Sequence, residues 1–201
     1  PRKAECYNPL QLVKRETNVT DKRVQKFAEI LVDHSARITT GDRVLIQSTT
    51  AGLPLVEALY ALILDRGGHP YTQLAFPEQS RVFFEHAGDI QLDHLPIFHS
   101  QAYETFESRF NIHSVTNLDA MKDVDPDKQR RFAKTTSSIL ETQFRRGAAG
   151  EFKWVTTLFP TQAYADQAGM SLSDYEDFVY SAVYADKDDP VALWKAVEAE
   201  Q

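Results

Sequence analysis

The side chains that could bind a metal ion are spread loosely along the sequence. The histidines are His34, His69, His86, His94, His99 and His113. Metal-binding histidines often stand at short fixed spacings, as in HExxH on a helix, and no such pair occurs here. The stretch from His86 to His99, which includes Asp89, Asp93 and His94, comes nearest to a set of ligands. Its irregular spacing favours a solvated loop over a metal site.

A second group of candidate residues lies near the C-terminus, where carboxylates and aromatic rings gather. The carboxylates are Asp174, Glu176, Asp177, Asp186, Asp188 and Asp189. Two carboxylates buried side by side can carry out acid–base chemistry. Asp174, however, follows Ser171 by three residues, which is the spacing of a capping box at a helix start. Negative charge there also suits the helix dipole, so we expect these residues to be structural.

Two further kinds of site lack their defining motif. The Gly-x-Ser-x-Gly elbow of serine hydrolases is missing. The loop STTAGLP (48–54) follows an apolar run and opens a helix, so its backbone N–H groups could hold an anion. It contains neither G-x-G-x-x-G nor the Gly-Lys-Ser/Thr of a P-loop. A tight strand–helix turn therefore explains this loop better than a nucleotide site does.

Composition excludes several classes of partner. The chain has 201 residues and a net charge of −7, which argues against nucleic acid and anionic lipid as partners. No apolar run approaches the roughly 20 residues of a membrane span. The N-terminal PRKAECYNP has no apolar segment behind it and does not resemble a secretory signal. Cys6 is the single cysteine, so no intrachain disulfide can form and a cytoplasmic location is the simplest expectation.

The spacing of apolar residues predicts alternating strands and helices. The strands are expected at 43–48, 69–76, 110–115 and 152–159. The helices are expected from Thr20 or Asp21 to about 34, at 53–66, from Pro77, at 101–108, 126–146, 162–168, 171–185 and 190–201. This order predicts one α/β domain over 1–201: a three-layer, parallel-type sheet of about four or five strands with helices on both faces, followed by a C-terminal helical segment.

Within these elements the sequence predicts which side chains are buried. Tyr60 is expected on the buried face of its helix, and Arg145 and Arg146 on the wet face of the long helix. Phe178 lies on a stripe with Tyr175 and Ala182 that is expected to face the core. Tyr180 and Tyr184 lie on a different face, for which an interface and core packing remain equal alternatives.

Several segments, taken together, resemble one enzyme family. KWVTTLFPTQAYADQAGMSLSDYEDFVYSA (153–182) and DKDDPVALW (186–194) are similar to the N-terminal domain of the thermophilic metalloaminopeptidases of the aminopeptidase T type. The shared features are a Trp-containing strand, Pro-Thr, an alanine/aromatic helix, an acidic-aromatic helix and an Asp-Pro-x-x-x-Trp helix. DVDPDKQRR (123–131), FAEILV (27–32) and GDRVLI (41–46) also fit, so the resemblance covers nearly the whole chain.

The resemblance implies a dimeric two-metal exopeptidase that removes N-terminal residues from peptides. Two divalent ions (zinc, cobalt or manganese) would clamp a bridging water and the scissile carbonyl. The family's metal ligands lie in a following domain, and none of their motifs matches this sequence. We therefore expect no catalytic or metal-binding residue here, no cofactor in this chain, and no activity of this chain alone.

The resemblance also implies partners and a position for four side chains. The expected partners are the protein's own C-terminal catalytic domain, a second copy in a homodimer, and a peptide substrate. Thr161, Tyr164, Tyr180 and Tyr184 are candidates for lining the substrate cavity or the interdomain surface. The alternative is that Thr161 caps the next helix and Tyr164 packs.

The ends of the sequence bear on which of two functions applies. Helix 190–201 has no capping residue after it, so we expect a longer protein, although a fraying terminal helix is possible. The second hypothesis is a stand-alone α/β binding or interaction module that has lost the peptidase domain.

Overall fold

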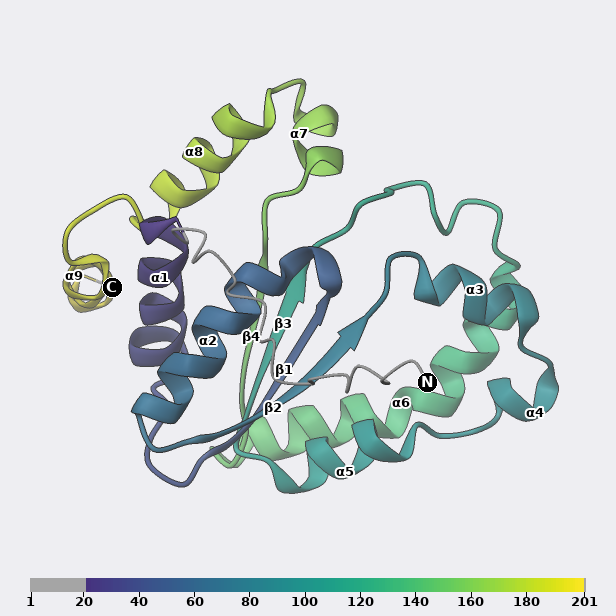
Figure 1. Cartoon of the computed structure of the whole chain (residues 1–201). Coiled ribbons are helices and arrows are strands. Elements are labelled where there is room, and N and C mark those ends of the chain that lie inside the picture. Colours follow the sequence, from purple (N-terminus) through teal and green to yellow (C-terminus); the bar gives the residue numbers. More distant parts are fainter. Residues whose placement is uncertain (1–20, 201) are drawn as a thin grey trace, which may run out of the picture.

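The structure is a computed structural model that describes residues 21–200 (Figure 1). Its strands are β1 (Arg43–Thr49), β2 (His69–Ala75), β3 (Ser108–His113) and β4 (Lys153–Leu158). Its helices are α1 (Lys22–Glu29), a π-helical continuation η1 (Ile30–Ser35), a 3-10 turn η2 (Thr50–Gly52), α2 (Leu53–Asp65), α3 (Gln79–His86), α4 (Asp89–Leu92), α5 (Ile97–Thr105), α6 (Pro126–Ala148), α7 (Gln162–Ala168), α8 (Leu172–Ala182) and α9 (Pro190–Ala199). Between residues 21 and 200, no helix is both long and apolar enough to cross a membrane.

The four strands form one parallel sheet in the order β2-β1-β3-β4. Gln47 in β1 stands opposite Gln73 in β2 and Asn111 in β3, which fixes the register across the centre. Strand and helix alternate along the chain, and parallel neighbours of this kind need a crossover between them. The predicted α/β fold is confirmed.

Each face of the sheet packs against its own layer of helices. Val44 and Ile46 of β1 join a large core with residues of α1 and α2, whereas Leu45 between them joins a smaller core with α5 and α6. Alternate residues of a strand point to opposite faces, so one strand supplies both cores. Figure 1 shows α5 and α6 on the opposite side of the sheet from α1 and α2.

The C-terminal helical segment packs on the outside of the layer that contains α1 and α2. α8 and α9 lie beyond α1 in Figure 1, and α9 contacts α1 and η1. Trp194 of α9 stacks on His34 with ring centroids 5.8 Å apart, and its indole N–H donates to the carbonyl of Val183 at 2.9 Å. A partly buried ring with a satisfied N–H is a common use of tryptophan at such a junction.

Two predicted boundaries around β3 were wrong. The helix predicted at 101–108 runs from Ile97 to Thr105, and the strand predicted at 110–115 runs from Ser108 to His113. Pro96 stands at the N-cap, so the helix begins directly after it. Ser108 is fully buried and pairs with Val44 and Lys153 at the start of β3.

The predicted burial was wrong for two aromatic residues and incomplete for a third. Tyr60 is 41% exposed and Phe178 is 59% exposed, whereas Tyr180 is only 2% exposed. Tyr180 meets Phe27 of α1 edge-on, with ring centroids 6.3 Å apart. α8 therefore turns its Tyr180 face toward α1 and its Phe178 face outward, the reverse of the stripe that helical spacing alone favoured.

The prediction that Arg146 lies on a wet helix face was also wrong. Arg146 is only 8% exposed. Its guanidinium donates to the carbonyls of Tyr103 and Phe106, each at 2.7 Å, and to that of Glu151 at 3.1 Å. It thereby supplies donors to the backbone carbonyls at the end of α5 and in the loop that enters β4. Its neighbour Arg145 is exposed, as predicted.

We predict that Arg146→Met destabilises the fold far more than Arg145→Met. Methionine keeps the apolar stem but leaves three carbonyls without their donor, which should lower the free energy of unfolding by about 2–4 kcal/mol. Arg145→Met should change it by less than about 0.5 kcal/mol, as surface substitutions usually do. Urea unfolding followed by circular dichroism measures both, and equal effects of the two substitutions would contradict the assignment.

Candidate functional site

The carboxyl ends of β1 and β3 meet where the strand order reverses, which is where open parallel sheets usually bind ligands. Three hydroxyls converge there. Ser48 Oγ lies 3.1 Å from Ser114 Oγ, and Thr49 Oγ1 lies 2.8 Å from the same Ser114 Oγ and 2.9 Å from the Ser114 carbonyl. Thr49 Oγ1 also accepts a hydrogen bond from the N–H of Ala51 at 3.2 Å. The hydroxyls thus bond to one another and to the turn, rather than to a histidine or carboxylate that could activate them.

Gly52 explains why the STTAGLP loop has the residues it has. A Cβ at this position would lie 2.4 Å from Ser48 Oγ and 3.0 Å from Ser114 Oγ. Only glycine lets the first turn of α2 approach β1 and β3 this closely. The geometry is that of the tight strand–helix turn that the sequence favoured over a nucleotide loop.

Thr161 fixes the loop that follows β4. It is buried, its hydroxyl donates to the carbonyl of Val115 at 2.6 Å, and it accepts from the N–H of Tyr164 at the start of α7. One hydroxyl therefore caps a helix and joins the loops after β3 and β4. The capping role foreseen as the alternative for Thr161 is confirmed, and its predicted place beside a substrate cavity stays a prediction.

Tyr164 lines a groove of about 530 Å³ between β4, α7 and α8. Its ring lies 6.4 Å from that of Tyr175, which lies 6.5 Å from that of the exposed Phe178. The groove is formed by Phe27, His113, Thr156, Thr157, Leu158, Tyr164, Tyr175, Phe178, Val179, Ala182 and Val183. Partial burial raises the pKa of the Tyr164 phenol, so this side chain is uncharged and offers apolar ring area with one polar tip.

The other two candidate tyrosines lie elsewhere. Tyr180 is buried between α8 and α1, and burial raises its pKa well above the ordinary value. Tyr184 follows α8 with a left-handed φ of 62° and packs edge-on against Trp194 at 5.8 Å. The four predicted residues therefore do not form one cluster, and Tyr164 alone among them lines the groove.

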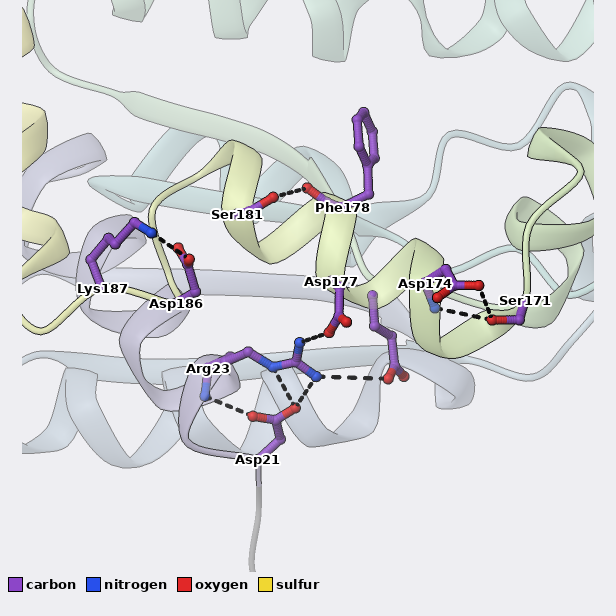
Figure 2. Close-up of polar contacts among 10 residues, drawn as sticks. Asp21, Arg23, Ser171, Asp174, Asp177, Phe178, Ser181, Asp186 and Lys187 are labelled. Carbon is purple, nitrogen blue, oxygen red and sulfur yellow. Dashed lines mark hydrogen bonds and ion pairs between the residues drawn. The ribbon is translucent and has the colours of Figure 1, made fainter.

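The acidic residues of α8 bind an arginine of α1 (Figure 2). Arg23 forms ion pairs with Asp21 at 2.7 Å, with Asp177 and, more weakly, with Glu176 at 3.9 Å. Its guanidinium carbon also stands 4.7 Å from the centroid of the Tyr180 ring. These contacts attach α8 to α1 and so hold one wall of the groove. Ser171 caps α8 by accepting from the N–H of Asp174 at 3.1 Å, which confirms the structural interpretation of that pair.

The loose His/Asp stretch from His86 to His99 does not gather into a metal site. Asp93 and Asp89 both pair with Arg131, at 2.7 Å and 2.6 Å. The Nε2 atom of His99 lies 2.5 Å from the amide oxygen of Gln73. Within residues 21–200, no group of three or more His, Cys, Asp or Glu side chains is placed to hold a metal ion. Cys6 lies outside the described residues.

Sequence reasoning missed a second cavity, of about 570 Å³, between α3, α5, α6 and the sheet. Arg109 of β3 and Gln73 of β2 line it, and Gln47 of β1 hydrogen-bonds to both. A parallel sheet covered on both faces is expected to have apolar residues in its strands, so these polar residues were the available signal.

The comparison with known families tests the resemblance that the sequence segments showed. The family described as "Thermophilic metalloprotease (M29)" matches residues 20–201. The chain belongs to this family. The resemblance inferred from the Pro-Thr to Asp-Pro-Trp segment is thereby confirmed.

Two relatives of the M29 chain define how much of a larger protein it spans. Aminopeptidase 2 of Geobacillus stearothermophilus is 26% identical over 189 residues, which cover 89% of this chain and 46% of that protein. The structure of wild-type AmpT from Thermus thermophilus matches with a TM-score of 0.67 and 16% identity, over 87% of this chain and 45% of that one. The latter likeness concerns the fold alone. The M29 chain thus spans about half the length of the relatives it matches.

We predict that Thr161→Ala destabilises the M29 chain and that Thr161→Ser does not. Alanine removes both the cap of α7 and the donor to Val115, which should cost about 1–2 kcal/mol of unfolding free energy. Serine keeps the hydroxyl and should stay within about 0.5 kcal/mol of the parent. Urea denaturation at pH 7 tests this, and a Thr161→Ala variant as stable as the parent would rule out the double role.

A second prediction concerns pH. Arg23 lowers the pKa of Asp21 below its ordinary value of 3.8, so the charge of Asp21 stabilises the fold above that pH, and this contribution is lost as the pH falls through the lowered pKa. Asp21→Asn keeps a capping oxygen but removes the charge. It should cost at most about 1 kcal/mol at pH 7, because the pair is partly exposed, and less at pH 2, where a larger share of Asp21 is protonated.

Urea unfolding at the two pH values measures this difference. Asp123→Asn, at an exposed carboxylate, serves as the control and should show no difference at either pH. If Asp21→Asn lowers the free energy of unfolding equally at pH 7 and pH 2, the charge of Asp21 is not the cause of the stabilisation.

Proposed function

We propose that this chain is the N-terminal domain of a metal-dependent aminopeptidase, a hydrolase that releases N-terminal residues from peptides. The observation that carries the proposal is the family match over residues 20–201. The name of the Geobacillus relative, Aminopeptidase 2, supports exopeptidase activity for the complete protein. Since the chain spans 46% of that relative, the proposal places catalysis in a second, C-terminal domain. The single cysteine suits a reducing, cytoplasmic location.

Two divalent ions, zinc, cobalt or manganese, are the cofactors proposed for the complete enzyme. The described residues do not fit the role of their ligands, because the carboxylates and histidines between residues 21 and 200 are not grouped to hold a metal. Asp21, Asp89, Asp93 and Asp177 are instead paired with arginines. No step of the reaction is assigned to a side chain of this domain.

The proposed contribution of this domain is architecture. The groove beside α8 presents Tyr164 and Phe178, and exposed aromatic area of this kind suits a surface against another domain, a second copy or a peptide. Tyr184 borders the same helix at its C-terminal end. Thr161 and Tyr180 act behind this surface, since they hold α7 and α8 in place. The peptide substrate and the homodimer belong to this proposal.

Peptidase assays on two lengths of the protein test the proposal. The 201-residue chain should not cleave leucine p-nitroanilide with added cobalt, zinc or manganese. The longer protein read from the same gene should cleave it, and EDTA should remove that activity. Turnover by the 201-residue chain that depends on metal and disappears with EDTA would contradict the proposal that catalysis belongs to a second domain.

The alternative is a stand-alone binding or interaction module that has lost the peptidase domain. The cavity between α3, α5 and α6 favours it, because binding there needs no second domain. The reading frame after the Gln201 codon separates the two proposals: a stop codon favours the module, and a continuing frame favours the aminopeptidase.

A further inference from the structure

The cavity between α3, α5, α6 and the sheet combines aromatic walls with a single positive charge. Its volume is about 570 Å³, within the range of small-molecule sites. The lining residues are Gln73, Gln79, Ser80, Phe83, Phe84, Pro96, His99, Tyr103, Arg109, Phe132, Thr136, Ile139, Leu140 and Gln143. None of them is a carboxylate. The whole chain has a net charge of −7, so a cavity lined by an arginine and by no carboxylate differs in charge from the rest of the protein.

Arg109 reaches the cavity from β3 and is held by neutral groups. Its Nε donates to the amide oxygen of Gln47 at 2.5 Å, and its Nη1 donates to the amide oxygen of Gln143 at 3.1 Å. The guanidinium carbon stands 5.2 Å from the centroid of the Tyr103 ring. A guanidinium has five N–H donors, and these two bonds use two of them. The group is thus fixed in orientation and keeps donors that these two amides do not use.

The other arginines of the described chain show that this is unusual. Each of them except Arg145 has a carboxylate within ion-pair distance: Arg23, Arg37, Arg43, Arg66, Arg81, Arg130, Arg131 and Arg146. Arg145 is exposed, so water solvates its charge. Arg109 is partly buried, and burial lowers its pKa. A cation that is both desolvated and unpaired is costly, and a bound anion would remove that cost.

Two neighbours define what the anion would meet. Tyr103 is 7% exposed and lines the cavity, so its hydroxyl can offer a further donor. Burial, together with the charge of Arg109, lowers the pKa of His99. His99 is therefore neutral at pH 7 and adds no second positive charge. The cavity thus matches one negative charge.

We infer that this cavity binds a small organic carboxylate whose remaining part is uncharged and apolar. A carboxylate fits the planar fork of a guanidinium. Phe83, Phe84 and Phe132, whose rings lie 4.9–5.9 Å apart, supply the surface for an apolar body. A phosphate dianion would have only one cation, and a free amino acid would bring an ammonium group that no carboxylate of the lining neutralises.

Binding of 3-phenylpropionate to the complete 201-residue chain tests the inference, with the uncharged 3-phenylpropanamide as the matched ligand. A ligand that binds only the folded state raises the melting temperature. The carboxylate should raise it in a dose-dependent way, and titration calorimetry should give a Kd at least tenfold lower than that of the amide. Phenylalanine and inorganic phosphate should bind at least tenfold more weakly than the carboxylate.

Three variants locate the binding. Arg109→Met should weaken binding of 3-phenylpropionate at least tenfold and bring its affinity close to that of the amide. Arg145→Met removes the other unpaired arginine and should bind like the parent. Tyr103→Phe removes one donor but keeps the ring, and should weaken binding several-fold. Circular dichroism checks the fold of each variant, and Tyr103→Phe together with the acid–amide comparison decides the matter if Arg109→Met does not fold.

The inference is overturned by any of five results. The first three are no thermal shift with 10 mM 3-phenylpropionate, equal affinity for acid and amide, and unchanged binding by a folded Arg109→Met variant. The fourth is phenylalanine or inorganic phosphate binding as tightly as the carboxylate. The fifth, where Arg109→Met does not fold, is unchanged binding by Tyr103→Phe.

Discussion

The arrangement of the C-terminal helices depends on Phe27 of α1, whose ring is buried by two neighbours. Phe27 belongs to the core between α1, α2 and the sheet, and its ring also meets Tyr180 of α8. Without α8 this second side of α1 would face water. Packing Tyr180 here fixes the rotation of α8, and Arg23 then pairs with Asp177 at the edge of the same contact. The groove that contains Tyr164 exists because α8 is held in this position.

Most strands and helices could be predicted from the spacing of their apolar residues. Short apolar runs bounded by turns indicated strands, and recurrence every three or four residues indicated helices. The burial of particular side chains did not follow, since it depends on contacts between distant segments. Phe178 and Tyr180 are two residues apart on one helix, and both are aromatic, so local spacing could not decide which faces α1. Arg146 looked like a surface charge because its three acceptors are backbone carbonyls, which leave no pattern in the side chains.

The candidate site shows the same division. Thr161 could be recognised as a cap from its place before a helix, but its bond to Val115 joins two loops that are far apart in sequence. The second cavity is marked in the sequence by Gln47, Gln73 and Arg109, which are polar residues in strands of a parallel sheet that is expected to be apolar. What could not be foreseen is that Arg109 lacks a carboxylate, because pairing of charges depends on the tertiary arrangement.

Arg146 and Arg109 enter the same helical layer and show two different ways of burying a guanidinium. Arg146 exchanges its hydration for backbone carbonyls and lies 3.5 Å from Glu151, so it is complete within the chain. Arg109 receives only two amide oxygens and keeps unused donors beside a cavity. If its role were structural, an acidic residue in place of Gln143 or Gln47 would serve better. Neutral amides orient the guanidinium without neutralising it, which leaves its charge available to a ligand that enters from solvent.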